Sequence, residues 1–399
     1  MRAWEVKELG AVSAISYGYT ESASVEPVGP RFLRITDIQD DHVDWDTVPY
    51  CKIQSVDLPK YRLASGDIVL ARTGATTGKS FLVTDPPEAV FASYLIRLRL
   101  IEKKLLPQFV YLFFQTPAYW KSIKDGSTGS AQGGFNATKL GALSVPIPPI
   151  LEQRRIVGIL DEAFDGIAAA KANAEKNLQN ARALFESHLQ AVFTKRREGW
   201  VETTLGDVCQ FENGDRGKNY PNREEYVESG MPWINTGHIQ PDGTLSQSEM
   251  NFISREKYES LRSGKIQPGD LVYCLRGATL GKTALVDPFT VGAVASSLVI
   301  IRPSDSLDRR FLYYFLTSPL GQGLIKLYDN GAAQPNLGAK SVAKYKISLP
   351  SLAEQAVIVR KLSALAAETQ RLESIFRQKL AALDALKKSL LDQAFTGVL

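Results

Sequence analysis

The sequence has little cysteine and little histidine, with three of each among 399 residues and no Cys-x-x-Cys pair. Cys51, Cys209 and Cys274 are too few and too scattered for a disulfide framework or a Cys/His zinc site. We expect three small buried thiols instead. Long apolar runs are also missing, since none reaches the roughly 18 to 20 residues that cross a bilayer. The mixed, charged N-terminus does not resemble a secretory signal. These absences predict a soluble, cytoplasmic protein.

An excess of charge of one sign is missing too. The 47 basic and 43 acidic residues leave a net charge of +4, and no segment of the chain forms a block of like charge. A balance this close to neutral does not by itself indicate a nucleic-acid binder. If the protein holds DNA, local patches or partner subunits must supply the positive charge.

Complete catalytic and cofactor motifs are absent as well. Segments 74–80 and 277–283 resemble P-loops, but they have three residues between the glycines instead of four, and strands are predicted to follow them. Segment 85–88 lacks the aromatic residue of the amino-methyltransferase motif, and no Ser-His-Asp set or metal cluster is evident. The sequence predicts a non-enzyme without cofactor or metal, with a nucleotide-binding enzyme as an alternative.

What the sequence does contain is the same series of motifs twice, about 200 residues apart. Segment 65–79, SGDIVLARTGATTGK, recurs as PGDLVYCLRGATLGK in 268–282. Glu152-Gln153 recurs as Glu354-Gln355. Solenoid repeats are only about 20 to 50 residues long. This domain-sized repeat therefore predicts two similar domains related by a pseudo-two-fold axis.

Each repeat is expected to contain a globule followed by a long helix. Short β-type runs alternate with turn residues and short helical stretches such as 107–114 and 309–317, which is typical of an α+β globule. Segments 151–197 and 352–396 contain no proline and favour helices of about 45 residues, or about 65 to 70 Å. The expected boundaries are 1–150 and 199–350 for the globules, and 151–198 and 351–399 for the helices.

Both predicted helices carry a heptad pattern of apolar residues. The pattern favours a coiled coil. It runs through Leu160, Ala163, Ile167, Ala170, Ala174, Asn177, Ala181, Leu184, His188 and Ala191 in the first helix, and through Leu362, Leu365, Thr369, Leu372, Phe376, Lys379, Leu383, Leu386, Leu390 and Gln393 in the second. Because the second globule joins both helices through short connections, the pair should be antiparallel. This predicts globules held apart at opposite ends of a rod, with the C-terminus near the N-terminus. In the alternative, each helix packs only on its own globule.

Polar loops on the globules are candidates for DNA contact. Arg and Lys can reach guanine edges or phosphates, and Thr can contact bases or the backbone. Scaffold positions recur in both repeats while the polar loop residues differ, as expected for two modules that read different sequences. The candidates are Arg34, Thr36, Arg72, Thr73, Thr76, Lys79 and Gln132 in the first repeat, and Arg216, Lys218, Tyr220, Asn235, His238, Arg276, Thr279, Lys282 and Gln334 in the second.

These repeated motifs together resemble one protein family. Each globule opens with Trp…Leu-Gly, at Trp4 and Trp200, contains the glycine-rich segment, and closes with Glu-Gln before a long helix. The combination resembles the specificity subunit of Type I restriction–modification enzymes over essentially the whole chain. The repeats differ in one respect, because Arg72 and Thr73 precede Gly74 whereas Arg276 directly precedes its glycine.

The resemblance implies a fold and a division of labour. It implies two α+β target-recognition domains separated by a long antiparallel two-helix coiled coil, each reading half of a bipartite site in double-stranded DNA. The helices would set the unread spacer and dock two methyltransferase subunits, with restriction or translocase subunits joining them. A protein–protein scaffold without DNA specificity is the alternative, and it predicts no salt-dependent affinity for DNA.

Overall fold

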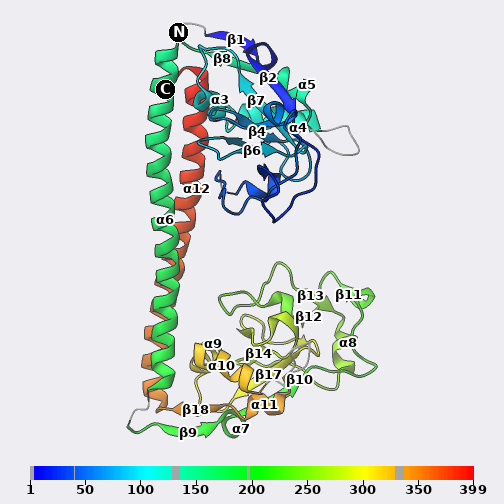
Figure 1. Cartoon of the computed structure of the whole chain (residues 1–399). Helices are drawn as coiled ribbons and strands as arrows, with labels where there is room; N and C mark the ends of the chain where they lie inside the picture. Colours follow the sequence, from blue (N-terminus) through cyan, green and yellow to red (C-terminus); the bar gives the residue numbers. More distant parts are fainter. Residues whose placement is uncertain (1–3, 40, 128–134, 196–197, 329–336) are drawn as a thin grey trace. The chain divides into compact units, whose positions relative to one another are not determined.

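The computed structural model describes residues 4–39, 41–127, 135–195, 198–328 and 337–399. The chain forms two compact units: unit 1 comprises 1–175 and 377–399, and unit 2 comprises 176–376. Each unit contains a mixed globule and a part of both long helices, α6 (Ile150–Thr194) and α12 (Leu352–Thr396) (Figure 1). Within the described residues, no helix is long and apolar enough to cross a membrane.

Unit 1 is built around one antiparallel sheet, with the strand order β2 (Ser13–Tyr17), β7 (Leu95–Leu100), β4 (Ile68–Ala71), β5 (Ser80–Leu82). Two further pairs are β1 (Glu5–Glu8) with β8 (Ser144–Ile147), antiparallel, and β3 (Arg31–Leu33) with β6 (Ala89–Phe91), parallel. The short helices are α1 (Leu9–Val12), η1 (Ile35–Asp37), α2 (Leu58–Tyr61), α3 (Pro107–Phe113), α4 (Pro117–Ser127) and α5 (Ala137–Gly141).

Unit 2 repeats this plan and extends the counterpart of the β3–β6 pair to four strands. The equivalent sheet has the order β10 (Cys209–Asn213), β17 (Leu298–Pro303), β14 (Leu271–Cys274), β15 (Thr283–Leu285). The parallel pair β12 (Met231–Ile234) and β16 (Ala293–Val294) corresponds to β3 and β6, and it is extended by β13 (Asn251–Ile253) and β11 (Tyr226–Val227). The strand β9 (Val201–Thr204) pairs with β18 (Lys346–Leu349), as β1 pairs with β8 in unit 1. The short helices are α7 (Leu205–Val208), η2 (Arg223–Glu225), η3 (Thr236–His238), α8 (Arg255–Ser260), η4 (Gly277–Thr279), α9 (Arg309–Thr317), α10 (Pro319–Tyr328) and α11 (Ala339–Ala343).

The repeat is visible in the ion pairs that stabilise each main sheet. Asp67 accepts two hydrogen bonds from Arg99, both of 2.7 Å, and Asp270 accepts two from Arg302, both of 2.8 Å. Both carboxylates are buried, and such bidentate pairing offsets the cost of removing a charge from water. The same contact in both units confirms the predicted domain-sized duplication.

A buried glutamine joins each globule to the start of its helix. Gln153 accepts a hydrogen bond from the Leu106 N–H at 2.9 Å and donates to the carbonyls of Lys104 and Pro148. Gln355 accepts from the Asp308 N–H at 2.7 Å and donates to the carbonyls of Ser306 and Pro350. The repeated Glu-Gln motif is therefore a junction: its glutamine satisfies backbone groups that burial would otherwise leave unpaired. 

The two long helices are antiparallel within each unit. In unit 1, Lys171 of α6 contacts Asp384 of α12, and the Lys387 ammonium lies 4.7 Å from the Phe164 ring centroid. In unit 2, Arg182 pairs with Glu373 at 2.9 Å. The helices also pack on the globules. The ring centroids of Phe109 in α3 and Phe395 in α12 are 4.8 Å apart, and those of Phe193 in α6 and Phe311 in α9 are 5.2 Å apart. The predicted pairing is confirmed, and the globule-only alternative is wrong.

The predicted heptad register holds only for the first part of each helix. Leu160, Ile167 and Ala174 are buried as expected, whereas Asn177, Leu184 and His188 are exposed and their neighbours Leu178, Phe185 and Leu189 face inward instead. The same one-residue shift occurs in α12, where Lys379, Leu386 and Gln393 are exposed. The cause is the 3.6-residue turn of a straight helix, which drifts by about 20° per heptad.

The end of α12 lies beside the first strand of unit 1. The Gly397 backbone approaches the indole ring of Trp4, and the Arg155 guanidinium donates a hydrogen bond of 2.6 Å to the carbonyl of Leu399. This confirms the expected return of the C-terminus to the N-terminal region. The three cysteines are buried free thiols, also as expected, and burial raises the pKa of Cys51 to about 11 and that of Cys209 to about 12.

Candidate nucleic-acid interface

The glycine-rich loop of each unit connects two antiparallel strands. It joins β4 to β5 in unit 1 and β14 to β15 in unit 2. The glycines at 74 and 78, and at 277 and 281, have φ between +74° and +89°, a region that glycine adopts without strain. Strands follow both loops, as predicted. A P-loop requires a helix at that point to bind phosphate, so the nucleotide-binding interpretation loses its structural basis.

Backbone hydrogen bonds align the two loops residue by residue. The Phe135 N–H donates to the Arg72 carbonyl, and the Leu337 N–H donates to the Leu275 carbonyl. This equivalence places Thr73 of unit 1 at the position of Arg276 in unit 2. In the same sheets, the equivalent strands β2 and β10 end at Tyr17 and Asn213. The repeats therefore present different side chains on the same backbone.

In unit 1 the space between the glycine-rich loop and the end of β2 is filled by a stacked pair, Arg72 on Tyr17. The Arg72 guanidinium lies 4.9 Å from the Tyr17 ring centroid and donates a long hydrogen bond, 3.4 Å, to the Ser93 carbonyl. The Tyr17 hydroxyl accepts a hydrogen bond of 3.0 Å from the Ala137 N–H. The stack presents a cation and an aromatic ring together, a combination that suits contact with bases or phosphates.

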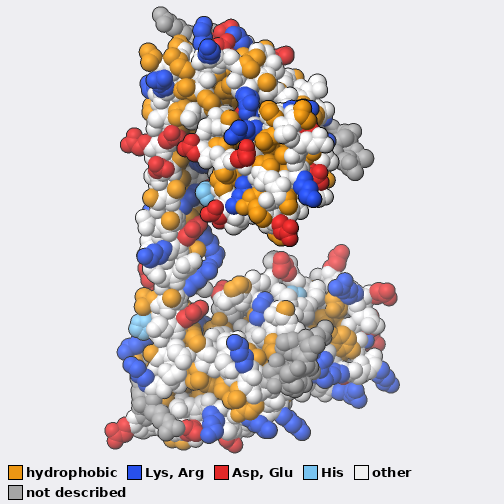
Figure 2. Space-filling model, in the orientation of Figure 1, with side chains coloured by type: hydrophobic (Ala, Val, Ile, Leu, Met, Phe, Trp, Pro, Cys, Tyr) orange, Lys and Arg blue, Asp and Glu red, His pale blue; other side chains and the backbone are white. Residues whose placement is uncertain are grey.

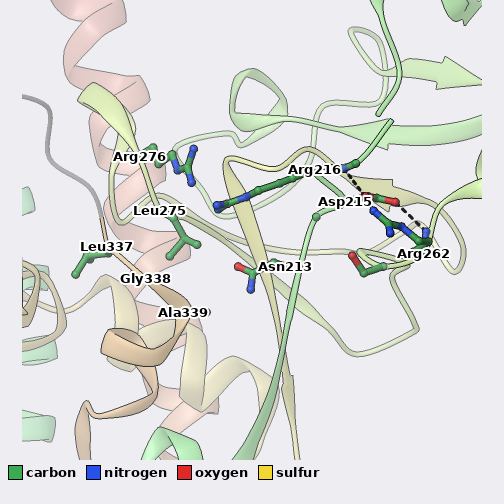
Figure 3. Close-up of a pocket in the computed structure, with 12 residues that line it drawn as sticks. Asn213, Asp215, Arg216, Arg262, Leu275, Arg276, Leu337, Gly338 and Ala339 are labelled. Carbon is green, nitrogen blue, oxygen red and sulfur yellow. Dashed lines mark hydrogen bonds and ion pairs between the residues drawn. The ribbon is translucent and has the colours of Figure 1, made fainter. Parts of the chain in front are cut away.

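In unit 2 the same position is a cavity of about 780 Å³ (Figure 3). Asn213 and Leu275 replace the aromatic ring and the arginine of unit 1, and the side chains of Arg216 and Arg276 extend into the space. The cavity is lined by Asn213, Gly214, Asp215, Arg216, Gly217, Arg262, Ser263, Leu275, Arg276, Leu337, Gly338 and Ala339.

The charged groups of this cavity are mostly donors. The Asp215 carboxylate accepts hydrogen bonds from the backbone N–H groups of Gly217 and Arg262, at 2.7 and 2.9 Å, and pairs with the Arg262 guanidinium at 3.7 Å. These backbone hydrogen bonds, more than the nearby Arg262 charge, lower the pKa of Asp215. The Arg276 Nε is buried and has no hydrogen-bond partner among the described residues. The cavity thus offers three guanidinium groups to a ligand rich in acceptors.

The other candidates of unit 1 lie on neighbouring loops. Arg34 caps η1 and donates two hydrogen bonds to Asp37, at 2.7 and 3.1 Å, which raise the pKa of the guanidinium. Thr36 is exposed beside it. Thr76 and Lys79 line a separate cavity of about 490 Å³ shared with α12, and the Lys79 ammonium donates to the Ile38 carbonyl at 3.4 Å. The structure therefore does not gather all the unit 1 candidates at one point.

The other candidates of unit 2 divide into exposed and packed side chains. Lys218 and Lys282 are exposed. Tyr220 packs edge-on against Trp233, with 5.4 Å between ring centroids, and Thr279 contacts the Cys274 thiol at 3.2 Å. The two remaining candidates, Asn235 and His238, form the cap of η3.

Gln132 and Gln334 lie outside the described residues. DNA contact by all sixteen candidates stays a prediction.

The sequence alone did not single out Arg262 or the contrast between Tyr17 and Asn213. Aligning the repeats by strand ends would have revealed that contrast, whereas nothing in the local sequence marks Arg262. On the face seen in Figure 2, basic and acidic side chains are interspersed over both units.

Comparison with known proteins gives a consistent result. A family model described as Type I restriction modification DNA specificity domain matches residues 1–179 and 197–380. The MjaX type I restriction enzyme specificity subunit of Methanocaldococcus jannaschii is 25% identical, over 99% of this chain and 93% of its own length. The EcoKI specificity subunit of Escherichia coli K12 is also 25% identical, over 85% of this chain and 76% of its own.

Solved structures show the same fold over the whole chain. A chain from work on "complex assembly and conformational transition of the type I R-M system" has a TM-score of 0.81 at 22% identity, covering 100% of this chain and 99% of that one. The HsdS subunit from Thermoanaerobacter tengcongensis has a TM-score of 0.60 at 20% identity, covering 100% and 98%.

Proposed function

This chain belongs to the family of the Type I restriction modification DNA specificity domain, and we propose that its two repeats each read one half of a bipartite DNA site. The chain is the DNA sequence-recognition subunit of a type I system. The assignment of one half-site to each repeat, and of the boundaries 1–150 and 199–350 to the recognition domains, is part of the proposal.

One observation carries this proposal: the repeats share their scaffold and differ in their loops. The Asp–Arg ion pairs and the glutamine junctions recur contact for contact. Beside the glycine-rich loop, however, unit 1 presents Arg72 on Tyr17 whereas unit 2 presents a cavity lined by arginine. A common scaffold with different polar surfaces suits two modules that read different bases.

The partners of the chain are DNA and methyltransferase subunits, and we propose that two methyltransferase copies dock on the long helices. Apolar side chains exposed on these helices support a docking role, because such surfaces often mark protein interfaces; they include Leu151, Ile159, Leu184, Val357, Ile375 and Leu386. Restriction or translocase subunits would join this core. The chain itself would catalyse no reaction, and its partners would supply the chemistry.

The proposal is tested by mapping modified adenines. The chain is expressed with its methyltransferase partner in a methylation-free host, and modified adenines are located genome-wide. We expect a split motif with a fixed gap, absent when this chain is omitted. Replacing residues 1–150 with those of a relative should change one half-site and leave the other intact.

A binding measurement separates this function from the protein-scaffold alternative. The assembled complex should bind its site with an affinity that falls as salt rises, because phosphate contacts release counterions. A folded complex with no modification and no salt-dependent DNA binding would contradict the proposal and favour the scaffold.

A further inference from the structure

We propose that the cavity of unit 2 reads a guanine, with Arg276 as the residue that contacts the base. This inference rests on the proposed function, and it adds the chemical identity of one recognised base. The cavity of about 780 Å³ lies where unit 1 holds its Tyr17–Arg72 stack, so the space is a property of unit 2.

The position of Arg276 suits a base contact better than a phosphate contact. Its Nε is buried and has no partner among the described residues, and a buried donor without a partner is costly unless a ligand supplies an acceptor. The 3₁₀ turn η4 follows it directly, and the contact between Cys274 and Thr279 spans the turn. By contrast, the Arg262 side chain is 72% exposed beside Asp215, as suits a more peripheral contact.

The charged side chains of the cavity favour guanine. Three arginines supply only donors, and the one carboxylate of the cavity, Asp215, already accepts two backbone hydrogen bonds. The amino groups of adenine and cytosine need an acceptor, whereas guanine presents two acceptors, O6 and N7, to the major groove. Arginine matches that pair with two parallel donors. Unit 1 has Thr73 in the equivalent place, so its half-site should not be read in this way.

The test maps modified adenines for the full complex with Arg276→Ala, Arg276→Gln and Arg276→Lys. Arg255→Gln is the matched control, because Arg255 is an exposed residue of the same unit that pairs with Glu259. We expect the wild-type motif to contain a guanine in the half-site read by unit 2. Arg276→Ala should lose about tenfold to hundredfold discrimination at that position, while the other half-site and the gap stay unchanged.

The two other variants distinguish a base contact from a phosphate contact. Gln pairs with adenine N6 and N7, so Arg276→Gln should shift the preference at that position towards adenine. Lys keeps the charge that a phosphate needs and can donate to guanine O6 and N7, but it lacks the rigid planar pair of donors, so Arg276→Lys should weaken the guanine preference without abolishing it. Arg255→Gln should keep the wild-type motif. A complex that still forms with Arg276→Lys allows the test even if Arg276→Ala fails to fold.

Three results would overturn the inference. They are a unit 2 half-site without guanine, an unchanged motif in Arg276→Lys and Arg276→Gln, or a uniform loss of methylation at all sites with a reduced salt dependence. In each case the wild type would still show a bipartite motif, so the proposed function would stand. The absence of any bipartite motif from the wild type would instead contradict the proposed function itself.

Discussion

At the scale of single residues, both repeats cap a short 3₁₀ helix, but they use different side chains as the hydrogen-bond acceptor. The Arg34 N–H donates to the Asp37 carboxylate at 2.8 Å, and the Asn235 N–H donates to His238 Nδ1 at 3.1 Å. Both contacts cap a short 3₁₀ helix. Sequence reasoning marked Arg34, Asn235 and His238 for DNA contact from their polarity. It could not detect that local backbone groups already use part of their hydrogen-bonding capacity.

The cap at His238 predicts a pH dependence for unit 2. Burial lowers the pKa of His238 below its ordinary 6.5, although Glu249 partly opposes the shift. Because the folded state favours the neutral ring, its contribution to stability is complete above pH 6.5 and is lost as the pH falls through the lowered folded pKa. We expect the thermal midpoint of unit 2 to fall in acid, and His238→Asn, which keeps an acceptor, to weaken this dependence.

Thermal unfolding of the full chain between pH 5 and pH 8 measures the effect. The matched control is His188→Asn, since His188 is exposed on α6, and this variant should follow the wild-type curve. Equal acid sensitivity in the wild type and His238→Asn would show that the imidazole is not the group responsible.

At the scale of elements, the helices were predicted better than their packing. The absence of proline and the abundance of helix formers correctly indicated two helices of 45 residues each. The heptad pattern indicated that they pair but placed Leu184 and Leu386 inside, where the structure leaves them exposed. The actual register depends on helix twist and on contacts with α3 and α9, which lie far away in the sequence.

Substitution of Gln355, at the junction between the globule and α12, should lower the folding stability of unit 2. Gln355→Ala removes the partners of the Ser306 and Pro350 carbonyls and of the Asp308 N–H. A buried polar group left unpaired costs about 1 to 3 kcal/mol. The bond to Pro350 is buried and the other two are part-buried, so we expect a loss of about 1 to 3 kcal/mol. Denaturant unfolding monitored by hydrogen exchange in unit 2 measures it. Gln393→Ala, an exposed change on the same helix, should have little effect, and equal effects of the two variants would refute the junction role.

At the scale of the whole molecule, we expect the helix pair to set the gap between the half-sites. Seven residues inserted into both helices, after Glu175 in α6 and after Phe376 in α12, would lengthen the pair by about 10 Å. At about 3.4 Å per base pair this corresponds to about three more base pairs of unread spacer. Mapping modified adenines measures the gap directly.

The insertion into both helices has an internal control. Insertion into α6 alone would shift the register that joins Lys171 to Asp384 and Arg182 to Glu373, and it should impair the complex. An unchanged gap in a folded, active protein with both insertions would rule out the helix pair as the ruler.

The sequence by itself determined the duplication, the α+β class of the globules, the paired long helices and the family. These properties follow from local patterns repeated along the chain, and such patterns survive without knowledge of distant contacts. Only the tertiary structure decided that the Tyr17–Arg72 stack of unit 1 is replaced by a cavity in unit 2, that Arg262 joins Arg216 at this cavity, and that His238 is buried. Each of these depends on segments distant in sequence meeting in space, where burial and hydrogen bonding determine which polar groups stay available to a ligand.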